Sequence, residues 1–185
     1  MKKTLLTIVL TVLVCCTVMG TTLALLVAQS ETVTNTFTIG DINITLEETT
    51  GNSYKMIPGS SFEKNPTVTV ETGSEACWLF VKVIKENNFD AFMTFEMADG
   101  WEALSGQAGV YYRKVTTDAD NGLGALTAEQ EIPVIKNNTV QVLDTVTQAD
   151  LTGEAPKLSF AAAAVQLENV DEVETAWDEV KTLLP

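Results

Sequence analysis

The sequence predicts an all-β protein: a jelly-roll or immunoglobulin-like β-sandwich that ends in an amphipathic helix and is preceded by an N-terminal signal helix. Three observations favour this fold class. Short segments rich in β-branched and aromatic residues recur between turn residues, the segment 77–86 begins apolar on both faces like a covered central strand, and the one clear helical pattern comes last. A chain of 185 residues has room for one such domain.

The N-terminus has the parts of an export signal. Lys2 and Lys3 precede an uncharged stretch that runs to Ser30, and Thr22-Leu23-Ala24 supplies a small-x-small site. We predict cleavage after Ala24, which divides the chain into a signal peptide (1–24), an N-terminal strand segment (25–40) and a β-sandwich domain with its C-terminal helix (41–185). The alternative is that the apolar stretch stays in the membrane as an uncleaved helix, since it is long enough to span a bilayer.

The charge after processing limits the partners. Removal of Lys2 and Lys3 leaves nine basic residues against 25 acidic ones, a net charge near −16. We expect such a chain to be soluble outside the cell or at its surface, to avoid nucleic acid, and to touch a membrane only through its signal segment.

The residue inventory removes the commonest catalytic groups. The chain has no His, and Cys77 is the one cysteine outside the signal segment. These absences disfavour most zinc sites and the Ser-His-Asp and Cys-His nucleophiles, so we predict no catalytic residue and no cofactor. A lone Cys77 in an apolar strand is expected to be a small core residue.

The first strand is predicted just after the cleavage site. In residues 31–40, Val33, Phe37 and Ile39 alternate with threonines, as in a half-buried strand. Beyond Gly40 the apolar parity changes to Ile42, Ile44 and Leu46, which indicates a bulge or bend at the glycine and a second short strand after it.

A loop with turns at Gly51-Asn52 and Pro58-Gly59 is expected over residues 47–66. Its apolar residues, Tyr54, Met56, Ile57 and Phe62, should pack at the end of the sandwich. Its charged residues, Lys55, Glu63 and Lys64, should lie in water. Strands are then predicted at 67–72, 77–86, 92–97, 109–117, 131–135, 138–144 and 157–168. The segments 131–135 and 138–144 are predicted to pair with each other as a hairpin joined through Lys136-Asn137.

The last segment, residues 169–185, predicts an amphipathic helix. Asn169 or Asp171 is the expected N-cap. The residues on the apolar face of this helix are Val170, Val173, Trp177, Val180 and Leu184.

Two further sets of residues are candidate binding groups. Asp118 and Asp120 alternate in a turn as calcium ligands do, although the spacing does not fit an EF-hand and a surface turn is the simpler interpretation. Four aromatic residues suggest a sugar-stacking platform or, more simply, parts of the core. These are Trp78, Trp101, Tyr111 and Tyr112.

Several stretches occur in an order that resembles the secreted proteins of Gram-positive bacteria processed by a SipW-type signal peptidase, the TasA/camelysin group of biofilm-matrix proteins. They are "GTTLA", "ETVTNTFTIGDINITLEE", "YKMIPGSSFEKNPTVTV", "GSEACWLFVKV", "GVYYRKV" and "LSFAAAAVQLENVDEVETAW". The resemblance covers nearly all of the chain. It implies a jelly-roll-like sandwich and donor-strand assembly, in which the segment freed by cleavage, about residues 25–39, completes the sheet of the next subunit.

Three functions are open at this point. The first is a secreted, non-enzymatic structural protein of the cell surface or biofilm matrix, with signal peptidase as its processing enzyme and itself or related matrix proteins as partners. Polymerisation would use the assembly strand Val33, Phe37 and Ile39 on an exposed sheet edge, unless that strand folds into its own domain. The second is a monomeric cell-envelope module that binds a glycan or protein, and the third is a camelysin-like metalloendopeptidase, which the absence of His disfavours.

Overall fold

The computed structural model describes residues 41–51, 54–119, 121–147 and 154–185, all within one compact unit, Ile39–Pro185. The predicted signal peptide with Thr22 and Ala24, and the predicted assembly strand with Val33, Phe37 and Ile39, lie outside the described residues. No helix in the described part of the chain is long and apolar enough to span a bilayer.

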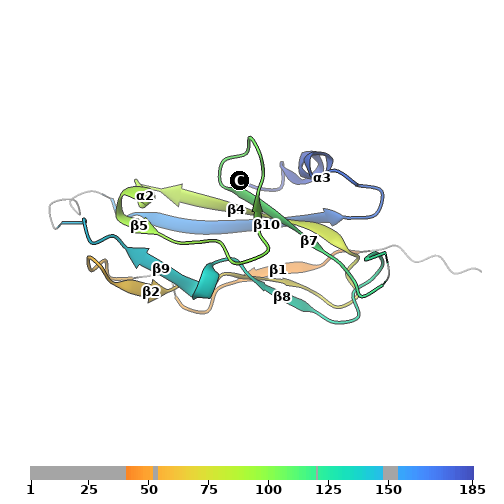
Figure 1. Cartoon of the computed structure of the whole chain (residues 1–185), viewed down its shortest axis with the longest axis horizontal. Coiled ribbons are helices and arrows are strands. Elements are labelled where there is room, and N and C mark those ends of the chain that lie inside the picture. Colours follow the sequence, from red (N-terminus) through yellow and green to blue (C-terminus); the bar gives the residue numbers. More distant parts are fainter. Residues whose placement is uncertain (1–40, 52–53, 120, 148–153) are drawn as a thin grey trace, which may run out of the picture. The chain divides into compact units, whose positions relative to one another are not determined.

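The described elements are mostly short strands (Figure 1). The strands are β1 (Ile44–Glu47), β2 (Ser61–Glu63), β3 (Thr67–Val70), β4 (Cys77–Glu86), β5 (Met93–Thr94), β6 (Glu102–Ala103), β7 (Val110–Val115), β8 (Gln130–Pro133), β9 (Thr139–Val142) and β10 (Lys157–Gln166). The helices are α2 (Phe89–Phe92), the 3-10 turn η1 (Lys136–Asn138) and α3 (Val173–Val180).

The strands form three antiparallel sheets with the orders β10-β4-β7-β6, β1-β3-β8 and β2-β9-β5. Figure 1 shows β4, β7 and β10 in one layer, with β1 and β8 and then β2 and β9 along the other. This arrangement confirms the all-β prediction at the level of antiparallel sheets.

Strand β4 is the centre of the fold, as its composition predicts. It pairs with β10 on one side and β7 on the other. Cys77 and Leu79 face the core between the sheets, whereas Trp78 and Phe80 face α3, and all four are buried. A strand covered on both faces needs apolar residues at every position, which explains the unbroken run at its start.

The core between the sheets joins the four-stranded sheet to β1-β3-β8. Its buried members are Val68, Val70, Cys77, Leu79, Val81, Ala98, Trp101, Val115, Leu126, Ile132 and Val134. A second buried group lies around α2, β5 and β9, where Phe89, Met93, Ile135, Val140, Val142 and Val146 pack together.

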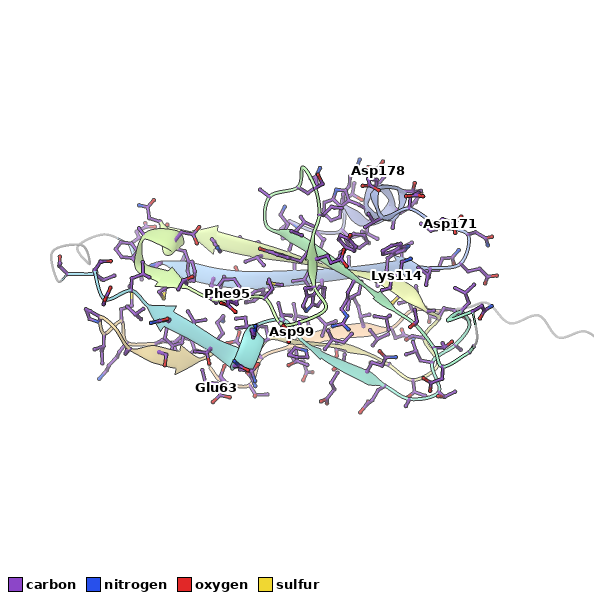
Figure 2. The ribbon with its side chains drawn as sticks, viewed as in Figure 1. Glu63, Phe95, Asp99, Lys114, Asp171 and Asp178 are labelled. Atoms are coloured by element: carbon purple, nitrogen blue, oxygen red, sulfur yellow. The ribbon has the colours of Figure 1, made fainter. Side chains whose placement is uncertain are left out.

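Helix α3 covers the outer face of the four-stranded sheet. The Trp177 and Phe80 ring centroids are 5.5 Å apart, and Trp78 Nε1 donates a hydrogen bond of 2.7 Å to the carbonyl of Val170. The predicted apolar face packs here, while Asp171 and Asp178 lie on the outer side, away from the sheet (Figure 2). The predicted cap is wrong: Glu172 occupies the N-cap position and makes no side-chain capping bond.

Two predictions of strand pairing and extent are also corrected. The segments around Lys136-Asn137 do not form a hairpin, because β8 pairs with β3 while β9 pairs with β2 and β5. Asn137 and Asn138 adopt positive φ values of 54° and 52°, and the chain changes sheets there. Residues 92–97 hold only the two-residue strand β5, and β2, β6 and α2 were not predicted.

Candidate functional site: the open edge of β10

Strand β10 is a long edge strand. Among the described residues, it has a partner strand on one side only. It is ten residues long and pairs with β4 along its whole length. Its other edge carries no ladder within the described sheets. Because the unpaired backbone groups of an edge strand can accept another strand, such an edge is a place for intermolecular pairing.

The inner face of β10 leaves room beside it. Phe160, Ala162 and Ala164 pack against the core between the sheets but stay only partly buried. Their register partners on β4 are Val83, Val81 and Leu79. Ala164 lines a cavity together with Ile42, and Ala162, at the preceding inward position, is equally small.

Strand β1 lies beside β10 without pairing to it. Its inward residues Ile44 and Leu46, together with Ile42 just before it, are also only partly buried on the same core. An apolar seam therefore separates β1 from β10, and the core is incompletely covered along it. We call this seam, with the free edge of β10, the β1–β10 groove.

The two strands run in opposite directions. Ile42, before β1, lines a cavity together with Ala164 near the end of β10. Glu48, just after β1, binds Lys64, whose Nζ lies 5.9 Å from the ring centroid of Phe160 near the start of β10. Ile42, at the start of the described domain, therefore lies at the end of the groove where β10 ends.

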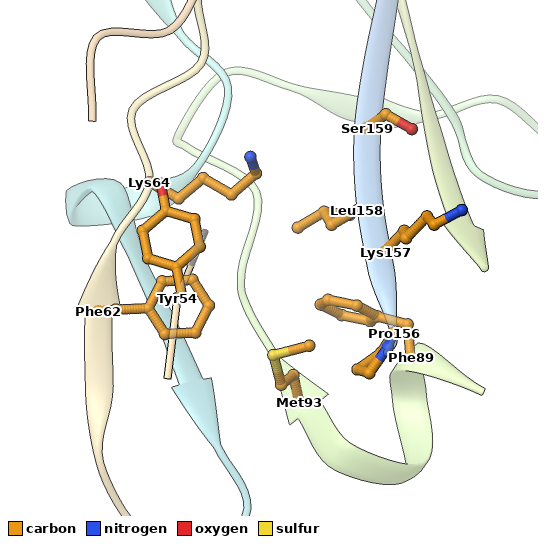
Figure 3. Close-up of a pocket in the computed structure, with 9 residues that line it drawn as sticks. All are labelled: Tyr54, Phe62, Lys64, Phe89, Met93, Pro156, Lys157, Leu158 and Ser159. Carbon is orange, nitrogen blue, oxygen red and sulfur yellow. The ribbon is translucent and has the colours of Figure 1, made fainter. Parts of the chain in front are cut away.

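A cavity of about 300 Å³ opens at the end of the groove where β10 starts. Figure 3 shows β10 on one side of it, Tyr54, Phe62 and Lys64 on the other, and Phe89 and Met93 at its base. Pro156, Lys157, Leu158 and Ser159 complete the lining. We call this the Phe62 cavity.

The Phe62 cavity has a rigid aromatic wall. The rings of Tyr54 and Phe62 stack with centroids 4.2 Å apart, and the Tyr54 hydroxyl donates a 2.7 Å hydrogen bond to the Gly51 carbonyl. Burial and the nearby Glu48 carboxylate raise the pKa of Tyr54, although its hydrogen bond with Thr50 opposes this. The hydroxyl therefore stays protonated at neutral pH and the wall is uncharged.

The charge of Lys64, at this end of the groove, is neutralised by Glu48. Lys64 is 8% exposed, and its Nζ lies 2.8 and 2.7 Å from the two Glu48 carboxylate oxygens. The expectation that Lys64 lies in water is wrong, because Glu48 reaches it across the loop. Ile57 is 58% exposed rather than packed, at a turn where Ser60 N donates to the Ile57 carbonyl and Gly59 has φ 74°.

The aromatic residues considered as a sugar platform do not form one surface. Trp78 and Tyr112 pack on the α3 side of the four-stranded sheet, whereas Trp101 and Tyr111 pack against the core on the opposite side. The alternation of adjacent residues in a strand causes this separation, since Tyr111 and Tyr112 must point to opposite faces. Trp101 is further held by a 2.9 Å hydrogen bond from its Nε1 to the Pro133 carbonyl.

The remaining candidates are also placed. Cys77 has no exposed surface, and its burial raises its pKa to about 12, so it is an inert core thiol. Asp118 is exposed, and Asp120 lies outside the described residues. In the described ranges no three acidic or cysteine side chains gather as metal ligands would.

Comparison with known proteins adds no assignment. The chain matches no protein-family model, and no characterised protein matches it in sequence. The groove is thus the feature of the described residues that bears on function. Sequence reasoning missed the Lys64–Glu48 pair and the Phe62 cavity. The run of four alanines at 161–164 was a visible sign of the groove beside β10.

Proposed function

We propose that this chain is a secreted, non-enzymatic structural protein of the cell surface or extracellular matrix, which assembles by adding residues 25–40 of one copy to the β1–β10 groove of another. The observation that carries the proposal is the free edge of β10, ten residues long, beside a partly uncovered core. An added strand would pair with this edge through its backbone and cover that core with alternate side chains.

The finer features of the proposal follow the resemblance to the TasA/camelysin group. The antiparallel sheets would be those of a jelly-roll or immunoglobulin-like sandwich, and a signal peptidase would release the chain at Ala24. Partners would be further copies or related matrix proteins. The acidic composition and the absence of His fit a structural role better than zinc peptidase chemistry.

Assembly is tested by removing the proposed strand. Protein that begins at Leu25 is compared with protein that begins at Gly40, by electron microscopy and sedimentation at equal concentration. Fibres are expected only from the longer protein. A third protein, with residues 25–39 scrambled, controls for length and composition and should not assemble.

Fibres that persist in the protein beginning at Gly40 would contradict strand addition. Processing is tested separately, by determining the N-terminal residue of protein recovered from expressing cells. Leu25 is expected there, and recovery of only chains that begin at Met1 would contradict release by a signal peptidase.

A further inference from the structure

We infer that the Phe62 cavity receives the side chain of Phe37 from a second copy, and that this contact sets the register and the direction of assembly. This inference rests on the proposed function and specifies it. It makes the cavity a specificity pocket for one aromatic side chain.

The chemistry of the cavity fits an aromatic side chain. Its apolar lining includes Tyr54, Phe62, Phe89, Met93 and Leu158, and the charge of Lys64 is taken up by Glu48. A volume of about 300 Å³ is at the lower end for binding pockets, which suits one side chain better than a larger ligand. Aromatic rings gain from edge and stacked contacts with other rings, and two of these lining rings are already stacked on each other.

The occupant is identified by the part of the chain that precedes the described residues. Phe37 is the one aromatic residue among residues 1–40. Val33 and Ile39 share its parity in the alternating pattern. These three would enter the groove from the same face of an added strand.

The length of the chain requires that Phe37 come from another copy. From Ala164, which shares a cavity with Ile42, to Leu158 in the Phe62 cavity is six residues of strand, about 20 Å. Phe37 precedes Ile42 by five residues, which span at most roughly 17 Å when fully extended. The chain would also have to reverse direction to run back beside its own β1, so its own Phe37 falls short.

The register then follows from antiparallel pairing with β10. If Phe37 lies opposite Leu158, Val33 lies opposite Ala162 and Ile39 opposite Pro156. Val33 thus meets the part of the groove where small residues leave room, and Ile39 meets another residue that lines the cavity. Val33, Phe37 and Ile39 therefore each have an apolar partner in this register.

The direction gives an open assembly. An added strand that runs antiparallel to β10 leaves the groove at the Phe62 cavity, so the donor domain lies beyond that end. The recipient's own chain enters at the opposite end, next to Ile42. Such a heterologous, head-to-tail contact links successive subunits in a row and does not produce a symmetric pair.

The register is tested by disulfide formation in the processed protein that begins at Leu25, where the buried Cys77 is the one native cysteine and is left unchanged. Val33→Cys combined with Ala162→Cys places two thiols on directly opposed residues, whose Cα atoms come within disulfide range in an antiparallel pair. Mild oxidation is expected to give a ladder of covalent oligomers. Thr34→Cys with Ala162→Cys, where the first thiol points to the other face, is the matched control and should give none.

The aromatic contact is tested by Phe37→Ala, with Thr36→Ala as its control. Loss of a buried phenyl ring is expected to raise the protein concentration needed for assembly about tenfold or more, whereas the threonine variant changes it less than about twofold. Urea denaturation of both variants and of the unsubstituted protein measures folding separately, and equal unfolding midpoints are expected.

The outcomes separate the two claims. If the unsubstituted protein that begins at Leu25 forms no oligomers, both the proposed function and this inference are wrong. If it assembles but the ladder is absent, appears equally with Thr34→Cys, or is replaced by monomers with an internal disulfide, the inference alone is wrong. Equal assembly by Phe37→Ala and unsubstituted protein also overturns it.

Discussion

Lys64 and Glu48 form a two-pronged ion pair across the loop that borders the groove, with Nζ 2.8 and 2.7 Å from the two carboxylate oxygens. The Lys64 side chain is 9% exposed and that of Glu48 24%. A buried cation that loses its partner keeps its desolvation cost. Glu48→Gln should therefore lower the free energy of unfolding by about 3 kcal/mol, as measured by urea denaturation.

The matched control for this variant is Asp178→Asn. Lys181 and Asp178 are also 2.7 Å apart, but their side chains are 50% and 67% exposed. An exposed pair contributes less than about 1 kcal/mol because water and salt screen it. Equal effects of the two substitutions would show that the Lys64 pair is no better shielded than a surface one.

Trp177 attaches α3 to the sheet. Its side chain is 8% exposed and lies against Phe80, with ring centroids 5.5 Å apart. Trp177→Ala should cost about 3–5 kcal/mol of unfolding free energy, since it removes a large buried ring and leaves a cavity. Leu183→Ala, at a side chain 71% exposed in the same terminal segment, should change the same quantity by less than about 0.5 kcal/mol.

Gly109 permits a close approach between two strands. Val83 N donates to the Gly109 carbonyl at 2.8 Å, and a Cβ on Gly109 would lie 2.8 Å from the Val83 oxygen. Gly106 has nearly the same φ, 75° against 74°, but nothing within 4 Å of such a Cβ. Alanine strains the backbone equally at both positions, but only Gly109→Ala adds a clash. Gly109→Ala should therefore lower the free energy of unfolding by about 1–3 kcal/mol more than Gly106→Ala, as measured by thermal unfolding.

Cys77 should make stability fall at high pH. Burial raises the pKa of this thiol from 9.0 to about 12, so above pH 9 the unfolded chain releases a proton that the folded chain retains. The protonated, buried thiol makes its full contribution to the free energy of unfolding below pH 9. This contribution is lost as pH rises toward 12, at about 1.4 kcal/mol per pH unit. Between pH 9 and 10.5, the stability of Cys77→Ala protein should decline less steeply in denaturant titrations; parallel curves would contradict the shift.

The sequence predicted the elements whose pattern is local. The run from Cys77 to Val81 identifies a strand covered on both faces, and the spacing of Val173, Trp177 and Val180 identifies the sheet-facing side of α3. Nothing local distinguishes a hairpin at Lys136-Asn137 from a crossing between sheets. The choice depends on Val68 opposite Ile132 and on Phe62 opposite Val140, pairs far apart in the chain.

The groove could not be predicted from local patterns either, because it depends on contacts between residues far apart in the chain. Glu48 and Lys64 are 16 residues apart, and their pairing requires that β1 and the loop before β3 be placed first. The split of the aromatic residues, by contrast, could have been read from the strand period alone, because Tyr111 and Tyr112 are adjacent in one strand.

The alanine run of β10 has one more consequence, for genetics. Ala161 and Ala163 pack beneath α3, whereas Ala162 and Ala164 face the gap beside β1. Bulky replacements at the odd positions should lower the yield of folded protein, and those at the even positions should leave the yield unchanged while blocking the proposed assembly. A saturation scan of this short stretch would thus sort alleles by parity into two classes, one of folding and one of association.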